Sequence, residues 1–86
     1  MSTLRIIVLE PEKEKADALA REAIFATIGL PIVSEVAVVR DMNKIKKYDV
    51  TETPALIIND KVRVFQEVPQ REEIKQWLHE EFKSIS

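Results

Sequence analysis

The segment Thr51–Asn59 constrains the fold of this chain more than any other. Pro54 directly precedes four apolar residues, Ala55–Ile58, which have the composition of a buried strand, and an Asn-Asp pair follows them. Proline cannot donate a hydrogen bond to a sheet, so sheets tolerate it at a strand's first residue or on an edge. The sequence therefore predicts a strand entrance at Thr53-Pro54. An X-Pro bond in such an entry loop is also where cis peptide bonds occur.

Two earlier segments are predicted to form parallel strands. Leu4–Leu9 is rich in β-branched residues and apolar after Arg5, which favours a strand buried on both faces. Ile32–Val39 is the second run, with Val36–Val39 as its apolar centre. A strand, a long helix and a strand make a βαβ unit, so we expect these two strands to be parallel.

The helix between these strands has clear boundary signals. Pro11 suits a first helical turn, and the glutamates beside it favour the helix dipole. Gly29, the only glycine in the chain, is expected to end the helix, and Pro31 prevents its resumption. The expected apolar stripe recurs at three-and-four spacing and consists of Ala16, Leu19, Ala20, Ala23, Ile24 and Thr27.

The second half of the chain is predicted to contain a short helix, a hairpin and a long helix. Asp41 can cap a helix over about 42–47, with Met42 and Ile45 pointing inward. The hairpin strands would be Ala55–Ile58 and Val62–Phe65, joined through Asn59-Asp60.

The last helix is expected over about residues 70–83. Its buried stripe would consist of Ile74, Trp77, Leu78 and Phe82. The element order is then βαβαββα, an α/β arrangement. Eighty-six residues suffice for one modest core, so we expect a single domain spanning residues 1–86.

Composition excludes several classes of function. A formal net charge of −2 offers no basic face for nucleic acid, and no apolar run is long enough to span a membrane. The N-terminal residues lack the pattern of a signal peptide, so a cytoplasmic location is expected. The absence of cysteine excludes thiolate nucleophiles and zinc–thiolate sites, and the single histidine excludes a metal site built from imidazoles. We expect no cofactor and no metal.

The element order, with a proline before the third strand, resembles a minimal thioredoxin or glutaredoxin fold. The resemblance is closest to the small thioredoxin-like, or glutaredoxin-like, redox-active disulfide proteins of archaea and bacteria, and it runs from Ile6 to Leu78. It rests on Thr53–Asn59, on Asp41–Tyr48 before it and on Val68–Lys75 after it. The resemblance implies a four-stranded mixed sheet with helices on both faces and a cis Thr53-Pro54 bond.

The chain departs from this family at the residues that carry its chemistry. The family has a Cys-Pro-X-Cys element before the first helix, and its two cysteines fall on Pro11 and Glu14, counted back from Gly29. Two family glycines are replaced by Asp49 and Asp60. Thiol–disulfide exchange requires an attacking thiolate. This chain therefore lacks the family's chemistry, and we expect no disulfide reductase activity.

The candidate site is the surface that corresponds to the family's active site. One interpretation of its glutamates is that they are solvated carboxylates favoured by the helix dipole. Another is that Glu14 places a permanent anion where the family holds a thiolate. A hard-metal site would need about six convergent oxygens and is not expected. The candidate residues are Glu10, Pro11, Glu12, Glu14, Tyr48, Thr53 and Pro54.

Two classes of function remain. The first is a non-catalytic module that binds a protein, a peptide or a second copy of the chain around the proline loop and the start of the first helix. The alternative is an enzyme or small-ligand binder that uses non-thiol groups of the same region. An exposed apolar patch would favour an interface, whereas a deep pocket with convergent polar groups would favour a ligand. We favour the first class, with neither nucleic acid nor membrane as a partner.

Overall fold

The structure, a computed structural model, describes residues 3–31 and 33–85, and side chains except those of residues 82, 84 and 85. The expected burial of Phe82 and the expected strand start at Ile32 therefore lie outside what the structure describes. The predicted element order is confirmed, with boundaries shifted by one or two residues. The elements are β1 (Thr3–Leu9), α1 (Lys13–Thr27), β2 (Val33–Val39), α2 (Met42–Lys46), β3 (Ala55–Ile58), β4 (Lys61–Val64) and α3 (Arg71–Ile85).

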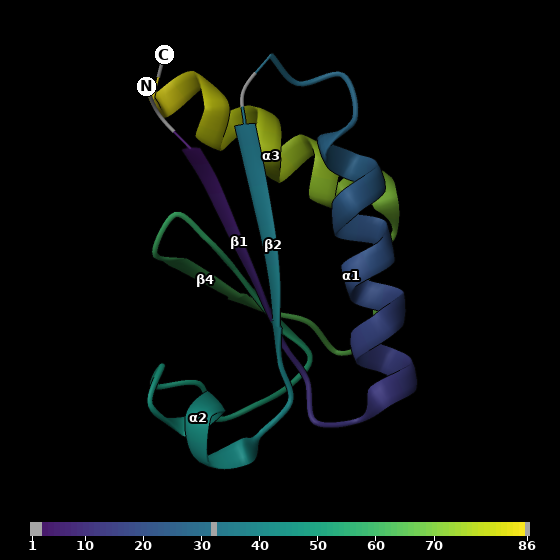
Figure 1. The fold of residues 1–86 in the computed structure, drawn as a ribbon, viewed down its shortest axis with the longest axis vertical. Coiled ribbons are helices and arrows are strands. Elements are labelled where there is room, and N and C mark those ends of the chain that lie inside the picture. The colour runs from purple at the N-terminus through teal and green to yellow at the C-terminus, as the bar shows by residue number, and fades with distance from the viewer. Residues whose placement is uncertain (1–2, 32, 86) are drawn as a thin grey trace.

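The four strands form one mixed sheet in the order β2-β1-β3-β4. β1 and β2 are parallel, as the βαβ unit predicted, with Ile6 opposite Val36. β3 is antiparallel to both β1 and β4. In Figure 1, β2 lies nearest the viewer and β4 furthest away, at the two edges of the sheet.

Helices cover both faces of the sheet, as expected. Alternate residues of β1 point to opposite faces. Leu4, Ile6 and Val8 pack in a cluster with residues of α1 and α3, whereas Leu9 packs in a second cluster with Ile45 of α2. Figure 1 shows α2 at the end of the sheet where β2 finishes, far from the chain termini. The end of β1 and the start of β3 are thereby held beside α2.

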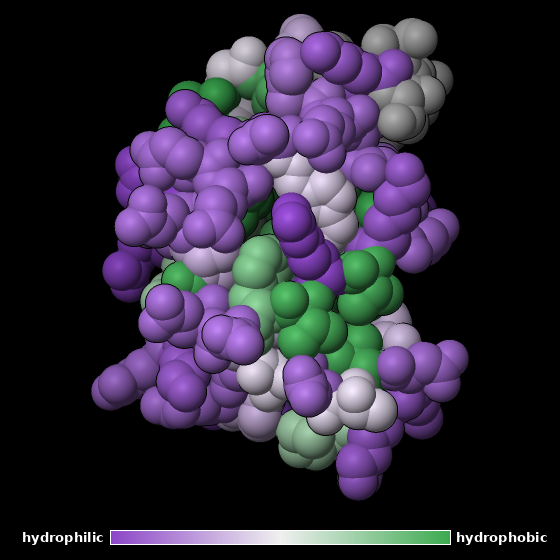
Figure 2. All heavy atoms as spheres, turned by 180° about the vertical axis from the view of Figure 1, so that it is seen from behind, coloured by the Kyte–Doolittle hydropathy of each residue, from purple (hydrophilic) through white to green (hydrophobic). Residues whose placement is uncertain are grey.

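Some residues expected to be buried are exposed instead. Ile24 was predicted to lie in the apolar stripe of α1 but is 51% exposed, and Ala26 occupies the buried position. Met42 was predicted to point inward but is 42% exposed, because the five-residue α2 directs only Ile45 at the sheet. Figure 2, seen from the side of β4, shows a hydrophobic group of residues within a largely hydrophilic surface, and Val62 of β4 is exposed.

The turns have the geometry that their residues predicted. Gly29 follows α1 with φ +90°, which confirms its role as the left-handed residue that ends the helix. Asp49 and Asp60, which stand where the resembled family has glycine, also have positive φ, as does Asn59. Asn and Asp tolerate this conformation better than most residues. The turns are therefore kept without glycine, and the Thr53-Pro54 bond is cis, as expected.

Candidate functional site

The smaller hydrophobic cluster assembles the candidate site. It is built from Leu9, Ile45, Val50, Ala55 and Ile57. The candidate site is made of three segments, and each is close in sequence to a residue of this cluster. The residues after β1 follow Leu9, the turn after α2 follows Ile45, and the proline loop precedes Ala55. The packing of these side chains therefore brings the start of α1, the end of α2 and the proline loop to one end of the molecule.

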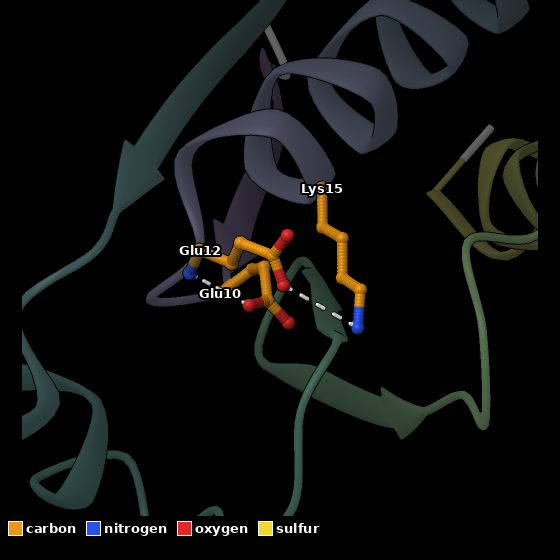
Figure 3. A network of polar contacts seen from close by, with 3 residues as sticks. All are labelled: Glu10, Glu12 and Lys15. Atoms are coloured by element: carbon orange, nitrogen blue, oxygen red, sulfur yellow. Dashed lines mark hydrogen bonds and ion pairs between the residues drawn. The ribbon is translucent and has the colours of Figure 1, made fainter.

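Glu10 is a buried residue that organises the start of α1. Its backbone N–H donates to the carbonyl of Val39 at 3.2 Å, which extends the ladder between β1 and β2. Its carboxylate oxygen Oε2 accepts the N–H of Glu12 at 2.7 Å (Figure 3). Glu12 is the N-cap residue of α1, and its own side chain makes no cap hydrogen bond. The charge-assisted bond from Glu10 thus fixes the backbone where the helix begins.

This placement corrects the interpretation of Glu10 as a solvated surface residue. Only 4% of the residue is exposed. It is withdrawn from solvent because the continuing β1–β2 ladder holds its backbone, and its carboxylate bends back over the chain toward Glu12. The carboxylate that accepts a backbone hydrogen bond at this helix start is that of Glu10. Glu14 lies exposed in the first helical turn, where the dipole interpretation places it.

Glu12 carries the exposed charge beside this turn. Its carboxylate lies 3.5 Å from the Nζ of Lys15, one turn along α1, and both side chains are more than half exposed. Ion pairs of this kind contribute at most about 1 kcal/mol, because water screens them. Glu12 and Lys15 therefore mark a polar, solvent-facing part of the site and do little to stabilise the fold.

The proline loop places Pro54 inside the molecule and leaves Tyr48 on its surface. Pro54 is buried, and its carbonyl accepts the N–H of Phe65 at 2.9 Å, which extends the β3–β4 ladder by one pair. Thr53 and Pro11 are half-buried. Tyr48 is 39% exposed at the end of α2. Pro54 therefore lies beneath the loop, and Tyr48 and Thr53 remain accessible at its surface.

Met42, which the sequence pattern assigned to the core, lies exposed at the end of the molecule that holds the candidate site. It begins α2, so it belongs to the same end of the molecule as Tyr48. A short helix that follows a capping aspartate offers little periodicity, and the sequence signal could not distinguish an inward from an outward methionine. Together, Met42 and Tyr48 give this end of the molecule two large, exposed, largely apolar side chains.

A second polar cluster, away from the candidate site, was not predicted. Glu81 of α3 is buried, and its carboxylate lies 3.0 Å from the Nζ of Lys61 on β4. The guanidinium of Arg63 lies over the ring of Trp77, 5.7 Å from its centroid. Glu81 falls at the i+7 position from Ile74 on the buried stripe, so helical spacing could have identified it. These contacts attach β4 to α3.

The chemical inventory of the site is limited. The chain has no cysteine, and the described residues contain no group of three or more side chains that could hold a metal ion. Within the same residues, no helix is long and apolar enough to cross a membrane. Glu10 is engaged by the backbone and Glu12 by Lys15. The arrangement offers a surface of mixed apolar and charged character, with carboxylates at the start of α1 and lysines on α2.

Comparison with known proteins identifies the family to which this geometry corresponds. A family model described as a thioredoxin domain matches residues 9–79. The match begins at the last residue of β1 and ends within α3, and it includes every candidate site residue. No curated protein matches the chain. The match confirms the resemblance that the proline loop and the element order indicated.

Proposed function

Because the chain belongs to the thioredoxin domain family and contains no cysteine, we propose that it is a redox-inactive binding module for a protein or peptide partner. The proposed binding area is called the proline-loop surface. It consists of Pro11, Glu12, Glu14, Met42, Tyr48 and Thr53, supported from below by Pro54 and Glu10.

The composition of the chain excludes the family's reaction. Thiol–disulfide exchange proceeds by attack of a thiolate on a disulfide sulfur. Pro11 and Glu14, which stand where the resembled family has its cysteines, carry no sulfur. A fold can persist while the chemistry at its site changes. The part of the site that needs no thiol is a surface on which another chain can dock.

The observation that carries the proposal is the exposure of Met42 and Tyr48 at this end of the molecule. Methionine adapts its shape to a partner, and tyrosine combines a large apolar ring with a hydroxyl, so both occur often in protein interfaces. The exposed carboxylates of Glu12 and Glu14 lie on the neighbouring segment. A partner segment with an apolar side chain flanked by polar groups would complement both features.

The alternative of a small-ligand site has less support. The cavities along α3 and β4 are lined by other residues, such as His79 and Gln76 in one and Arg63 and Glu73 in another. The four cavities lined by described residues at these places include no residue of the proline-loop surface. The most buried carboxylate of the site, that of Glu10, is used by the backbone N–H of Glu12. The cytoplasmic location expected from the sequence stays a prediction.

Affinity capture with matched variants tests the proposal. The wild-type chain, immobilised and exposed to lysate of its native host, is compared with the double variant Met42→Ser/Tyr48→Ser and with the control Val62→Ser/Val64→Ser. The control pair alters two similarly exposed apolar residues elsewhere. We expect a protein that the wild type and the control retain and the double variant loses by at least tenfold. Equal retention by all three, or turnover of insulin disulfides by the purified chain, would contradict the proposal.

A further inference from the structure

The outer edge of β2 is an open strand edge that spans seven residues. β2 pairs with β1 alone in the described part of the chain, and the register between them runs without a bulge from Val33 to Val39. Val33 is 61% exposed and Val38 42% exposed, and Glu35 is the only charged residue in the strand. Edge strands of this length and character are templates for pairing with another strand, and proteins usually protect them with lysine, proline or bulges.

The hydrogen bonds of β1 and β2 show which backbone groups face outward. The N–H of Glu10 donates to the carbonyl of Val39, so Val39 directs its backbone groups at β1. Successive residues in a strand alternate between the two sides, so Glu35 and Ala37 also face β1. The N–H and C=O groups of the intervening residues, Ser34, Val36 and Val38, therefore point away from the sheet.

One antiparallel register satisfies all of these outward groups. With a two-fold axis at Val36, that residue pairs with Val36 of a second copy, and Ser34 pairs with Val38 of the second copy. Hydrogen-bonded pairs in an antiparallel ladder recur every second residue. The three outward N–H and three outward C=O groups of each copy would then be hydrogen-bonded together.

Charge permits this pairing at β2 and opposes it at β4. In the register centred on Val36, Glu35 lies opposite Ala37 of the second copy, so no like charges face each other. The other edge strand, β4, contains Lys61 and Arg63. A symmetric β4 pairing centred on Arg63 places two guanidinium groups together, and one centred on Val62 places Arg63 against Lys61. Like charges directly opposite each other destabilise a strand pair, so β2 is the edge suited to a second copy.

The helix above β2 presents an apolar side chain over the same edge. α1 meets α3 on one flank, where the guanidinium of Arg71 lies 4.3 Å from the ring centroid of Phe25. α1 packs on β1 and β2, whereas α3 contacts β4 through the Lys61–Glu81 pair. Successive residues of a helix are about 100° apart, so Ile24 lies to one side of the buried Ala23 and Phe25 lies nearly opposite it. Because Phe25 reaches α3 from the other side, Ile24 lies on the flank turned away from α3. The exposure of Ile24, unexpected from the sequence, is explained if this flank faces a second copy.

We infer that two copies of the chain pair through β2 in the register centred on Val36, which forms a continuous eight-stranded sheet. The two α1 helices then lie on the same face, because the two-fold axis is perpendicular to the sheet. Exposed Val38 and Ile24 of each copy lie along the junction. The contact is isologous and closed, as in most soluble homodimers. It lies apart from the proline-loop surface and does not depend on the function proposed for that surface.

Sedimentation equilibrium with matched edge variants tests the pairing. Over about 1 µM to 1 mM chain, we expect the wild type to shift from its 9.9 kDa monomer to twice that mass. Val38→Lys places a cation on the pairing edge, and each dimer contains two of them. We expect this variant to raise the dissociation constant by about 100-fold, roughly tenfold per copy. Val62→Lys makes the same change at similar exposure on β4 and should leave the dissociation constant within about threefold.

Three results would overturn the pairing. The first is a monomer at every concentration, and the second is a dimer that Val62→Lys weakens and Val38→Lys does not. The third is open-ended assembly larger than a dimer, because a contact between β2 of one copy and β4 of the next would leave further edges free. Thermal melting of both variants shows whether each is folded. Should Val38→Lys fail to fold, the cysteine variants described next decide the question.

A cysteine introduced into this cysteine-free chain reports the register. Residues of a hydrogen-bonded antiparallel pair have Cα atoms about 5.5 Å apart, within the range that a disulfide spans. Oxidised Val36→Cys should form a covalent dimer. Ala37→Cys, one residue away and on the other face, should form at least tenfold less covalent dimer under the same conditions. Equal cross-linking of both variants, or none of Val36→Cys, would contradict the register centred on Val36.

Discussion

The two faces of the sheet share the same strands but are covered very differently. On one face, two fifteen-residue helices bury Leu4, Ile6, Val8, Leu56 and Ile58 almost completely. On the other face, the five-residue α2 contributes one fully buried side chain, Ile45. Beyond α2, Val62 and Val64 on that face remain exposed. Strand alternation supplies apolar residues to both faces, and the length of the covering helix decides how many of them are buried.

The candidate site lies at the end of the sheet that α2 covers. The larger cluster joins β1, β3, α1 and α3, so its loss would unfold the whole chain. The smaller cluster joins the end of β1, α2 and the proline loop. Regions with few buried apolar contacts open at lower free energy than the core. We therefore expect the proline-loop surface to open locally while α1 and α3 remain folded.

Leu56→Ala should have the largest effect on stability. Leu56 is fully buried in the cluster beneath α1 and α3. The substitution should lower the free energy of unfolding by about 3–4 kcal/mol, since it removes buried methyl groups and leaves a cavity. Urea denaturation followed by circular dichroism measures the change, and the loss should appear in every probe at once. A loss below about 1.5 kcal/mol would show that the larger cluster is not the main core.

Ile45→Ala should have a smaller and more local effect. Ile45 is fully buried, but the cluster around it is small and lies at one end of the sheet. We expect a loss of about 2–3 kcal/mol. Hydrogen exchange should show lost protection in residues 42–54 and nearly unchanged protection in β3, α1 and α3. Met42→Ala, at an exposed position of the same helix, should change stability by less than about 0.5 kcal/mol. Uniform loss of protection would show that the two clusters unfold as one unit.

The sequence predicted the fold well because its strongest signals are local. Gly29 ends α1, and Pro54 marks the start of β3 through its missing donor, whereas Pro11 lies just before the N-cap Glu12 and not in the first helical turn as expected. Residues with turn propensity, such as Asn59 and Asp60, have the expected left-handed backbone. Each of these signals acts within a few residues. These signals do not depend on contacts with distant parts of the chain. They were sufficient to predict the order of the elements and to identify the family.

Side-chain exposure was predicted less well because it depends on distant elements. Ile24 fits a helical stripe by spacing, but whether its flank is covered depends on what lies beyond the edge of β2. Glu10 was assigned to the surface because nothing local shows that the β1–β2 ladder continues through it. The candidate site was found through family resemblance, and the division of its residues between supporting and exposed roles required the structure.

Glu10→Gln tests the point where β1 leaves the sheet and α1 begins. The buried carboxylate accepts the N–H of Glu12 near the positive end of the α1 dipole. Replacing it with a neutral amide keeps an acceptor but removes the charge, so we expect a loss of about 1 kcal/mol. Urea denaturation measures the loss, and Glu12→Gln, at an exposed position, should have less than half the effect. If the two variants were equally destabilised, the helix dipole alone would account for both losses. The buried hydrogen bond from Glu12 to Glu10 would then contribute nothing further to stability.

Asp60→Gly should have the smallest effect and the opposite sign. The Asn59-Asp60 turn connects β3, which is buried on both faces, to β4, which is exposed at every residue. Asp60 has φ +72°, a conformation that favours glycine. Glycine removes this strain but gives the unfolded chain more conformational freedom, which costs about 0.4–1 kcal/mol. The left-handed conformation costs most non-glycine residues about 1–2 kcal/mol, so we expect a net gain of about 0.5 kcal/mol in urea denaturation. Asp60→Ala keeps the strain and loses the local polar group, so it should be destabilising. If alanine proved more stable than glycine at this position, the turn would not hold the left-handed geometry in solution, and the pairing of exposed β4 with buried β3 would depend on the strand ladder and not on this turn.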